Sequence, residues 1–454
     1  MNALLTDEYQ LTMLEACLHE GMTSQAVFEL YVRRLPPQRN YLVAAGLEQA
    51  LELLETLTLD GAELDWLACR PGTSARTVDC LRHWRFEGDV DAMPEGTVFF
   101  PDEPVLRITA PLHQAQFVET RLLNIVHYQT LVASKASRIV TAAEGRPVVD
   151  FGLRRAPGAE AGLYAARAAY IAGFAATATS AAGLRYGIPV VGTMTHSYVQ
   201  AHASELQAFE AYARSQTRRP VLLVDTYDVD AALAQVVPLV RRLADDGIPV
   251  AGVRIEGGDL ARHARTARTL FDRAGLDGLD IFASGELDEH RIARLLADAA
   301  PIDAFGVGTA LAASSDAPAL ETVYKLQSYA GEPCRKRAGS QVSWPGLRQV
   351  DRFLGPDGHM AYDRIRRDGE RTSGGAPLLA PVMRGGRRVG PAPTLQDIRR
   401  HHQAQMRLLP ARLRGLMPDD GSRYPVQISD GLRSLASSLA ASDCRGRSEA
   451  DALP

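Results

Sequence analysis

Two kinds of hydrophobic pattern follow one another along the chain. From about residue 146, apolar runs of roughly five to seven residues recur between helix-like stretches of roughly 10 to 25 residues. This alternation predicts right-handed βαβ units and a parallel sheet. The predicted strands are RPVVDF, IPVVGT, VLLVDT, PVAGVRI, LDIFA and IDAFGV.

Polar and glycine-rich residues follow every one of these predicted strands. In an α/β barrel the C-terminal ends of all strands meet at one mouth, whereas an open doubly wound sheet gathers its polar residues at one switch point. The even distribution therefore favours a barrel, with the open sheet as the alternative. The segments concerned are 150–155, 192–197, 225–228, 254–259, 284–288 and 306–309.

The first 128 residues or so mix amphipathic helices with short strands. LLTDEYQLTMLEACLHEG predicts a helix with Thr6 as N-cap, and AQFVETRLLNIVHYQTLVASKASRIV predicts a long helix or a helix pair. AVFELYVRRLP and GTVFFPDEPVLRITAPL predict strands. After about residue 330, WPGLRQVDRFLGPDGHMAYDRI predicts short strands around a GPDG turn, which we expect to join the N-terminal sheet.

These patterns give a domain organisation. We expect an N-terminal α/β domain at 1–128, an α/β barrel with the active site at 129–325, and a C-terminal segment at 326–435 that packs on the N-terminal domain. The Ser/Ala-rich residues 436–454 are expected to be a frayed tail. The uncharged run 168–184 is too weakly apolar for a membrane span and predicts a small-residue helix.

Composition excludes several classes of protein. The chain has 454 residues, of which 46% are hydrophobic and 23% charged, which excludes a disordered chain, a collagen-like fibre and a small disulfide scaffold. A net charge of −4 gives no global argument for nucleic acid or an anionic membrane as a partner. The five cysteines form no CxxC pair, which favours reduced thiols and a cytoplasmic location.

Lysine is scarce, because arginine fills every basic position except Lys135, Lys325 and Lys336. If lysines have drifted to arginine, the survivors mark places where a compact ammonium is needed. Lys135 and Lys325 are therefore candidate phosphate contacts, with chance survival as the alternative.

Candidate chemistry comes from the strand ends, since the sequence has no P-loop lysine, no GxGxxG and no HExxH, and predicts no metal site formed by protein ligands. His196 follows a predicted strand and can act as acid, base or nucleophile near neutral pH, or serve only as a structural hydrogen-bonding group. Arg154 and Arg254 can each clamp a carboxylate or form an internal ion pair. Glu256 lies two residues after Arg254 and faces the same way on a strand, so the two can pair.

Glycine turns at the strand ends add a phosphate-binding element. Gly257-Gly258 and Gly308-Thr309 offer backbone N–H groups at strand-to-helix turns, where phosphate binds well in barrels. With arginines for an anion, acids for hydroxyls or Mg²⁺ and one histidine, these turns favour a phosphorylated, sugar-like substrate. They do not identify the reaction.

The same residues carry a family resemblance. Ten strings resemble nicotinate phosphoribosyltransferases in the same order, over about residues 4 to 350: TDEYQLTM, FELYVRR, NIVHYQTLVASKASRIV, DFGLRRAPG, GTMTHSYVQ, LLVDTYDV, GVRIEGGDL, IFASGELDE, FGVGTALAAS and YKL. The resemblance implies a type II phosphoribosyltransferase fold, an irregular α/β barrel beside a smaller α/β sandwich domain built from N- and C-terminal segments. It implies formation of nicotinate mononucleotide and pyrophosphate from nicotinate and phosphoribosyl pyrophosphate, coupled to ATP hydrolysis, with Mg²⁺ as cofactor and a homodimer as the active form.

The resemblance also assigns roles to residues. It implies that His196 is the phosphohistidine, that Arg154 and Arg254 hold the nicotinate carboxylate, that Thr193 contacts nicotinate, and that Tyr9 covers the pyridine ring of a neighbouring subunit. Gly308 and Thr309 would hold the 5′-phosphate. The remaining substrate contacts it implies are Glu256, Gly257, Gly258 and Gly285. The family usually has Asp-Ser-Gly-Asp where this chain has Glu256-Gly257-Gly258-Asp259.

Four alternatives stay open at this point. Nicotinamide phosphoribosyltransferase shares the plan, but a neutral amide needs no arginine pair, and quinolinate phosphoribosyltransferase needs more cations for a dicarboxylate. A non-catalytic nucleotide-binding regulator would explain the altered Glu256-Gly257-Gly258 turn. The arginine-rich segment 384–414 would suit nucleic acid, although it lacks aromatic residues.

Overall fold

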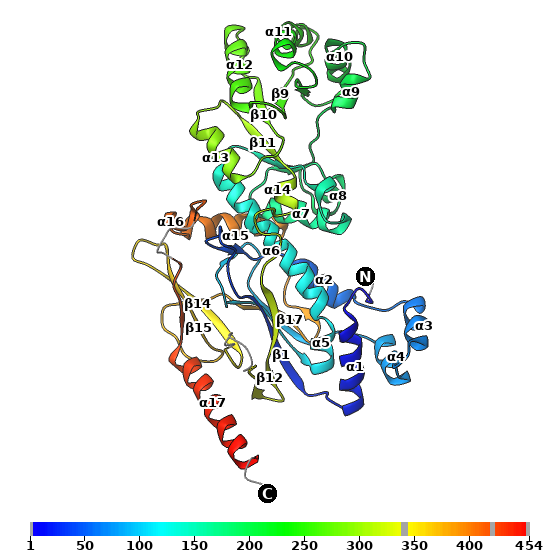
Figure 1. Cartoon of the computed structure of the whole chain (residues 1–454), viewed down its shortest axis with the longest axis vertical. Helices are drawn as coiled ribbons and strands as arrows, with labels where there is room; N and C mark the ends of the chain where they lie inside the picture. The colour runs from blue at the N-terminus through cyan, green and yellow to red at the C-terminus, as the bar shows by residue number, and fades with distance from the viewer. Residues whose placement is uncertain (1–2, 337–343, 418–422, 451–454) are drawn as a thin grey trace. The chain divides into compact units, whose positions relative to one another are not determined.

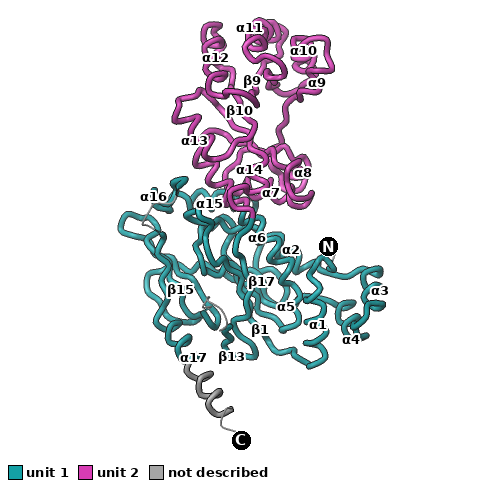
Figure 2. The backbone as a smooth tube through the Cα atoms, viewed as in Figure 1, with its two compact units in different colours: residues 1–131, 319–454 teal, residues 132–318 magenta. Residues whose placement is uncertain are grey.

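Two compact units make up the chain in the computed structural model, which describes residues 3–336, 344–417 and 423–450. Residues 1–131 and 319–454 form unit 1, and residues 132–318 form unit 2 (Figure 2). Helix α6 (Glu119–Ala142) carries the chain from the first unit into the second (Figure 1). Strand β12 (Thr322–Tyr329) lies in unit 1, so the second crossing comes before residue 325, where we expected the barrel to end.

Unit 2 is built on a parallel sheet. Its described strands have the spatial order β7-β6-β11-β10-β9-β8, and every pairing between them is parallel. Leu222, Val253, Ile281 and Phe305, from the middle of four strands, are fully buried, as expected for a parallel sheet covered by helices. The strands are β6 (Val148–Asp150), β7 (Ala176–Thr177), β8 (Val221–Leu223), β9 (Gly252–Ile255), β10 (Asp280–Ala283) and β11 (Ala304–Val307).

Strands that follow one another along the chain are neighbours in this sheet, and the sheet is open between β7 and β8 in the described residues. Strands β8 to β11 pair in succession, β11 pairs with β6, and β6 pairs with β7, but the described residues contain no ladder between β7 and β8. The result is a parallel half-barrel sheet. The loops that follow β6, β9, β10 and β11 leave from the same edge, because parallel strands end on one side.

One predicted strand, at 188–193, does not form as a strand of this sheet. Val190 makes only an isolated parallel bridge to Thr177, supported by backbone hydrogen bonds from Thr177 to Pro189 and from Val191 to Thr177. Pro189 has no N–H to donate, and Gly192 follows directly, so the pairing stops after one bridge.

The expected small-residue helix at 168–184 is also wrong as a single helix. Helix α7 (Ala159–Ala172) ends at Gly173, whose φ of 121° is a conformation that glycine adopts without strain. Strand β7 follows, and helix α8 (Ser180–Tyr186) comes after it. The small side chains of segment 168–184 are compatible with a closely packed helix. They are equally compatible with a short edge strand, and residues 176 and 177 form β7.

The remaining helices of unit 2 lie between its strands. Helix α11 packs against α10 and α12, and α12 contacts β9 and β10. The helical elements are η1 (Leu153–Arg155), α9 (His196–Gln200), α10 (Glu205–Ser215), α11 (Val229–Asp245), α12 (Leu260–Arg273), α13 (Glu289–Ala297) and α14 (Thr309–Ala312).

Unit 1 contains an antiparallel sheet that joins segments far apart in the sequence. The described strands have the order β13-β12-β1-β5-β3-β17-β18. Helix α5 (Leu112–Phe117) packs on β1 and β5, and α1 (Glu8–Glu20) packs on α5. The strands not yet given bounds are β1 (Gln25–Val32), β3 (Asp89–Ala92), β5 (Pro104–Pro111), β13 (Glu332–Pro333), β17 (Ala380–Arg384) and β18 (Arg387–Arg388).

The strands around the GPDG turn do not join that sheet, contrary to the prediction. β14 (Arg348–Leu354) and β15 (Met360–Arg367) form their own sheet with β16 (Ala376–Pro377) and β19 (Val426–Ile428). The hairpin was predicted correctly, but pairing partners distant in sequence leave no local signal. Two further short strands, β2 (Leu42–Val43) and β4 (Val98–Phe99), pair with each other.

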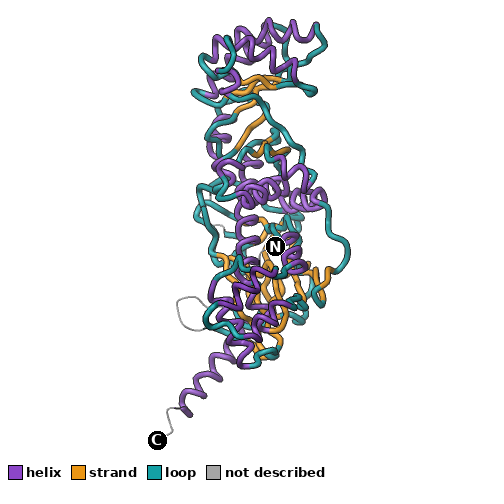
Figure 3. The backbone as a smooth tube through the Cα atoms, turned by 90° about the vertical axis from the view of Figure 1, so that its right-hand side faces the viewer, coloured by secondary structure: helices purple, strands orange, loops and turns teal. Residues whose placement is uncertain are grey.

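Two helix ends differ from the prediction. The N-cap position of α1 is Asp7 and not Thr6, and it makes no side-chain capping bond. Helix α17 (Asp430–Ala450) leads toward the C-terminus (Figure 3) and covers most of the expected frayed tail, because alanine and leucine are strong helix formers. Residues 451–454 lie outside the described residues. The other helices of unit 1 are α2 (Leu47–Thr56), α3 (Gly61–Cys69), α4 (Ala75–Arg82), α15 (Leu395–Leu408) and α16 (Ala411–Arg414).

Several arginines of segment 384–414 pair within unit 1. Arg384 pairs with Asp91, and Arg388 pairs with both Glu48 and Glu55. These guanidinium groups therefore support the fold, which is the ordinary explanation for an arginine-rich segment. Among the described residues, no helix is long and apolar enough to cross a membrane.

Candidate active site

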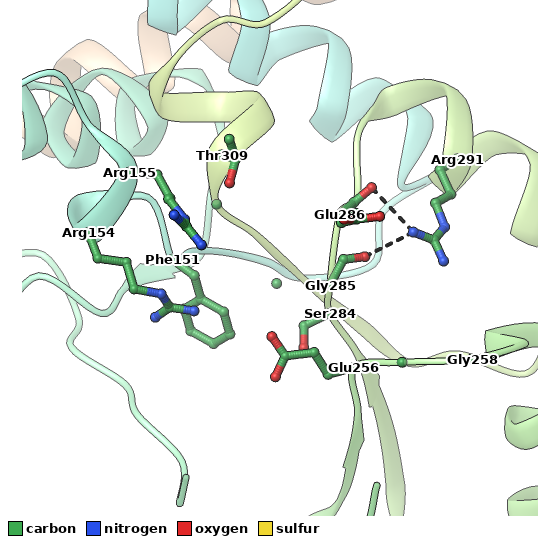
Figure 4. Close-up of a pocket in the computed structure, with 13 residues that line it drawn as sticks. Phe151, Arg154, Arg155, Glu256, Gly258, Ser284, Gly285, Glu286, Arg291 and Thr309 are labelled. Carbon is green, nitrogen blue, oxygen red and sulfur yellow. Dashed lines mark hydrogen bonds between the residues drawn. The ribbon is translucent and has the colours of Figure 1, made fainter. Parts of the chain in front are cut away.

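A cavity of about 530 Å³ opens at the edge of the half-barrel where the strands end (Figure 4). The loops after β6, β9, β10 and β11 form its wall, and α13 adds one arginine. The lining residues are Phe151, Arg154, Arg155, Glu256, Gly257, Gly258, Ser284, Gly285, Glu286, Arg291, Gly306, Gly308 and Thr309.

Two glycines allow these loops to approach one another. A Cβ at Gly285, where φ is 84°, would lie 2.0 Å from the carbonyl oxygen of Glu256. A Cβ at Gly306 would lie 2.6 Å from the ring of Phe151. A side chain at position 285 would force the loops after β9 and β10 apart, and one at position 306 would displace the ring of Phe151, which lines the cavity.

One side of the cavity carries two arginines that pair with no other residue in the described part of the chain. Arg154 and Arg155 belong to η1, directly after β6, and both side chains are exposed. Among the described residues, neither guanidinium has a recorded hydrogen bond or ion pair. Figure 4 shows both side chains on the same side of the cavity, across from Glu256 and Ser284. An anion in the cavity can therefore take up their hydrogen bonds.

Arg254 lies behind the opposite wall. Its Nε donates to Ser284 Oγ at 2.8 Å, Nη1 donates to Thr193 Oγ1 at 2.8 Å, and Nη2 donates to Glu256 Oε2 at 2.7 Å. The guanidinium also lies 5.2 Å from the ring centre of Phe151. Burial lowers the pKa of Arg254, and the negative charge of Glu256 opposes that shift. Arg254 stays charged, because even a lowered arginine pKa lies far above neutrality.

Glu256 connects Arg254 to His196. The Oε2 atom of Glu256 that accepts from Arg254 is also 3.5 Å from His196 Nε2. The other ring nitrogen of His196, Nδ1, is 3.1 Å from Thr226 Oγ1. His196 is the first residue of α9, and its side chain is 42% exposed.

Two carboxylates hold the loops in place, those of the half-buried Asp225 and the buried Asp150. Asp225 Oδ2 accepts from the backbone N–H groups of Glu256 and Gly257, each at 2.8 Å. Asp150 accepts from the backbone N–H of Gly152 at 2.7 Å and from Thr177 Oγ1 at 2.6 Å. Burial raises the pKa of Asp150, although both hydrogen bonds lower it. The loops after β6 and β9 are thereby fixed by acids that do not line the cavity.

The part of the chain that forms this cavity matches a known protein family. The family model for nicotinate phosphoribosyltransferases matches residues 147–333, which include all the lining residues, and its N- and C-terminal domain models match residues 4–127 and 373–436. A nicotinate phosphoribosyltransferase of Mycobacterium tuberculosis is 46% identical over 433 residues, which cover 95% of this chain and 92% of that protein. The chain belongs to the nicotinate phosphoribosyltransferase family.

Other relatives agree with this assignment. The nicotinate phosphoribosyltransferase of Bacillus subtilis is 41% identical and covers 79% of this chain and 74% of its own length. The crystal structure of the human nicotinic acid phosphoribosyltransferase superposes with a TM-score of 0.85 at 28% identity, over 96% of this chain and all of that chain. The family assignment therefore rests on sequence and fold together.

Within this family framework, most of the predicted site residues meet at the cavity. Arg154, Glu256, Gly257, Gly258, Gly285, Gly308 and Thr309 line it. Arg254, Thr193 and His196 do not line it, but each contacts Glu256 or Arg254. Tyr9 and Lys325 lie in unit 1, where the Tyr9 side chain is 47% exposed. Their predicted roles stay predictions.

Lys135 does not reach this cavity, contrary to its expected place near a phosphate. Its side chain is 1% exposed, and Nζ lies 2.6 Å from Glu289 Oε2 and 2.8 Å from Asp316 Oδ1. Arg138 pairs with the other oxygen of Glu289 at 3.0 Å. The ammonium of Lys135 therefore belongs to a buried ion cluster in this structure.

The sequence analysis did not select Phe151 and Arg291. Phe151 follows β6 directly, and its ring packs 5.8 Å from that of Phe282 while supporting Arg254. Arg291 lies on α13 and donates to the carbonyl of Gly285 at 3.2 Å. Phe151 lies within segment 150–155, which was predicted to face the active site because of its polar residues. Its place directly after a predicted strand was the signal that could have identified it. Arg291 lies on helix α13, outside the strand-end segments, so no sequence signal identified it.

Proposed function

We propose that this protein is a nicotinate phosphoribosyltransferase. It transfers the phosphoribosyl group of phosphoribosyl pyrophosphate to nicotinate and yields nicotinate mononucleotide and pyrophosphate. The observation that carries the proposal is a cavity, within the span matched by the family model, in which two unpaired arginines face glycine-rich strand ends. The names of its relatives support the same activity.

The reaction needs positioning more than acid–base chemistry. The pyridine nitrogen of nicotinate supplies the electron pair, its bond to ribose C1 forms, and the bond from C1 to the pyrophosphate oxygen breaks. Positive charge develops on the ribose and negative charge on the leaving group. Prepositioned donors can stabilise the latter, and orientation of two bound reactants can supply much of the acceleration.

The cavity offers groups for each part of the substrates. Arg154 can hold the nicotinate carboxylate, with Thr193 and Arg254 behind the opposite wall. The turn at Gly308 and Thr309 can hold the 5′-phosphate with its backbone N–H groups. The glycines at 257, 258 and 285 let the sugar and pyrophosphate lie close to the backbone.

Mg²⁺ fits this site as a companion of the phosphate substrates. Glu256 and Glu286 line the cavity and present carboxylate oxygens, which are ligands that Mg²⁺ takes alongside phosphates. When bound, Mg²⁺ neutralises charge on the pyrophosphate. Among the described residues, no group of three or more His, Cys, Asp or Glu side chains is placed to hold a metal ion.

ATP coupling is proposed to act through His196. Nε2 of His196 attacks the γ-phosphorus of ATP, an N–P bond forms, and the bond to the ADP oxygen breaks. The partial exposure of the His196 side chain and the contact of Nδ1 with Thr226 support this role, since that contact orients the ring. His196→Ala should lose the acid-labile phosphate seen by intact-mass analysis after ATP treatment, while slow phosphoribosyl transfer remains. A phosphate that persists in the variant would reject the assignment.

The proposed function also implies a particular type of barrel and a dimeric active form. We infer that the half-barrel is the irregular α/β barrel of type II phosphoribosyltransferases and that unit 1 is the accompanying sandwich domain. The active form is a homodimer in which Tyr9 reaches the cavity of the neighbouring subunit. The exposure of Tyr9 supports this arrangement. Sedimentation combined with assay tests it, because an active dilute monomer would contradict it.

A turnover assay tests the proposed activity. Nicotinate, nicotinamide and quinolinate are each offered with phosphoribosyl pyrophosphate, with and without ATP. We expect turnover of nicotinate well above that of the other two, and stimulation by ATP. Equal use of nicotinate and nicotinamide would contradict the proposal, and preference for quinolinate would favour the dicarboxylate enzyme. Absence of turnover with all three would favour a regulator.

A further inference from the structure

Glu256 separates Arg254 from the cavity. Three residues that contact the Arg254 side chain, namely Glu256, Ser284 and Phe151, line the cavity, whereas Arg254 itself does not. The Arg254 side chain is 11% exposed, compared with 31% for Glu256. A ligand that enters the cavity therefore meets the carboxylate of Glu256 before it meets the guanidinium of Arg254.

The bond to Glu256 is the replaceable one among the three that Arg254 makes. Nε and Nη1 donate to the neutral hydroxyls of Ser284 and Thr193, and only Nη2 donates to a charged group. If Glu256 leaves, the hydroxyls still fix the plane of the guanidinium. A carboxylate on the ligand can then take the same place with the same charge and geometry. A neutral amide cannot compensate, since it would leave the buried guanidinium without an anion.

The displaced carboxylate has another partner close by. His196 Nε2 is 3.5 Å from the oxygen that Arg254 now holds, and the His196 ring is anchored through Nδ1 by Thr226. The backbone of Glu256 does not need to move, because Asp225 holds its N–H and that of Gly257. A rotation of the Glu256 side chain is enough to uncover Nη2.

We propose that Glu256 is a displaceable internal carboxylate that covers Arg254 and has to be exchanged for the carboxylate of a ligand before that ligand binds the guanidinium. The ligand carboxylate takes the place of Glu256 on Nη2, and the Glu256 side chain turns toward His196. This inference rests on the proposed function, in which nicotinate is the monocarboxylate. Glu256 then limits the affinity of the cavity for carboxylate ligands and does not act only as a contact for sugar or Mg²⁺.

Ligand binding to three variants tests the inference. Dissociation constants for nicotinate and nicotinamide are measured by calorimetry without phosphoribosyl pyrophosphate, for wild type, Glu256→Gln and Glu256→Asp. Glu286→Gln is the matched control, because it removes the same charge from the same cavity at a residue with no recorded contact to Arg254. Thermal melting checks that every variant is folded.

We expect Glu256→Gln to bind nicotinate about tenfold more tightly than wild type, since a charge-assisted bond no longer has to be broken first. Glu256→Asp should also bind more tightly, because its shorter side chain withdraws from Nη2 while keeping its charge. Nicotinamide affinity should change by less than about threefold in either variant.

Three results would overturn the inference. Weaker or unchanged nicotinate binding in Glu256→Gln would show that Glu256 is a fixed support. An equal gain in Glu286→Gln would show a general effect of cavity charge, and no gain in Glu256→Asp would show the same. Because the measured quantity is binding, these results are separate from the turnover assay, whose failure would contradict the proposed activity instead.

Discussion

At the scale of single residues, burial distinguishes two arginines, Arg154 and Arg254, for which the sequence predicts the same role. Arg154 and Arg254 both stand at strand ends, and both were predicted to hold a carboxylate. The structure leaves Arg154 open to the cavity and gives Arg254 three side-chain partners. Sequence spacing predicted the Arg254–Glu256 contact, because the two residues face the same way. It had no means of showing that this contact closes Arg254 off from the cavity.

Arg154→Lys tests the open arginine. The substitution keeps the charge but removes the planar pair of donors that matches a carboxylate. We expect the KM for nicotinate to rise about tenfold, which corresponds to about 1.4 kcal/mol, while the KM for phosphoribosyl pyrophosphate changes little. Steady-state kinetics with each substrate varied in turn measures both constants. Equal changes in the two KM values would place Arg154 elsewhere in the reaction.

At the scale of elements, apolar runs predicted the strands of the half-barrel well where helices separate them. β6, β8, β9, β10 and β11 all lie within predicted segments. The errors came where side chains are small or proline intervenes. β7 arose inside a run expected to be helical, and the segment at 188–193 made only one bridge. Alanine, glycine and threonine permit either structure, so tertiary packing decided.

Gly285→Ala tests how closely the loops after β9 and β10 must approach. The new Cβ would lie 2.0 Å from the backbone oxygen of Glu256, a position that only a movement of the main chain can relieve. We expect loss of most activity and a melting temperature several degrees below wild type, from a cost of about 2 kcal/mol or more.

Gly275→Ala is the matched control for that substitution. Gly275 has a similar positive φ of 68°, but a Cβ there would meet nothing within 4 Å. It should therefore show only the conformational cost, about 1 kcal/mol, with activity retained. If both variants lose stability equally and both stay active, loop contact at Gly285 does not shape the site.

At the scale of the whole molecule, distant segments of the chain build unit 1. β17 pairs with β3, although about three hundred residues separate them, and β14 pairs with β15 in a separate sheet. The sequence predicted strands in the C-terminal region but placed the GPDG hairpin in the wrong sheet. Which strands pair with each other depends on contacts between distant segments, and local sequence patterns do not predict such contacts.

Buried Glu103 is expected to make the stability of unit 1 depend on pH. Glu103 and Asp363 are both fully buried, and Arg352 donates to Asp363 at 2.6 Å. Burial, followed by the charge of Asp363, raises the pKa of Glu103 well above its ordinary value near 4.5. The folded state therefore keeps a proton that the unfolded chain releases. The free energy of unfolding attributable to Glu103 is full at low pH and falls as pH rises above about 4.5 toward the folded pKa.

Glu103→Gln should remove that dependence. In wild type the contribution falls by about 1.4 kcal/mol for each pH unit inside the window, and the variant should lack this slope because glutamine does not titrate. Urea unfolding of wild type and variant at several pH values between 5 and 9 measures the difference. Parallel stability curves would show that Glu103 is ionised in the folded protein.

The half-barrel cavity is proposed to bind nicotinate and the phosphoribosyl group side by side. A crystal structure of the protein with nicotinate mononucleotide tests it most directly. The account predicts the 5′-phosphate at the Gly308–Thr309 turn, the pyridine carboxylate on Arg154, and Glu256 turned away from Arg254 with a second carboxylate contact in its place. A nucleotide bound outside this cavity, or bound with its carboxylate away from both arginines, would contradict the account.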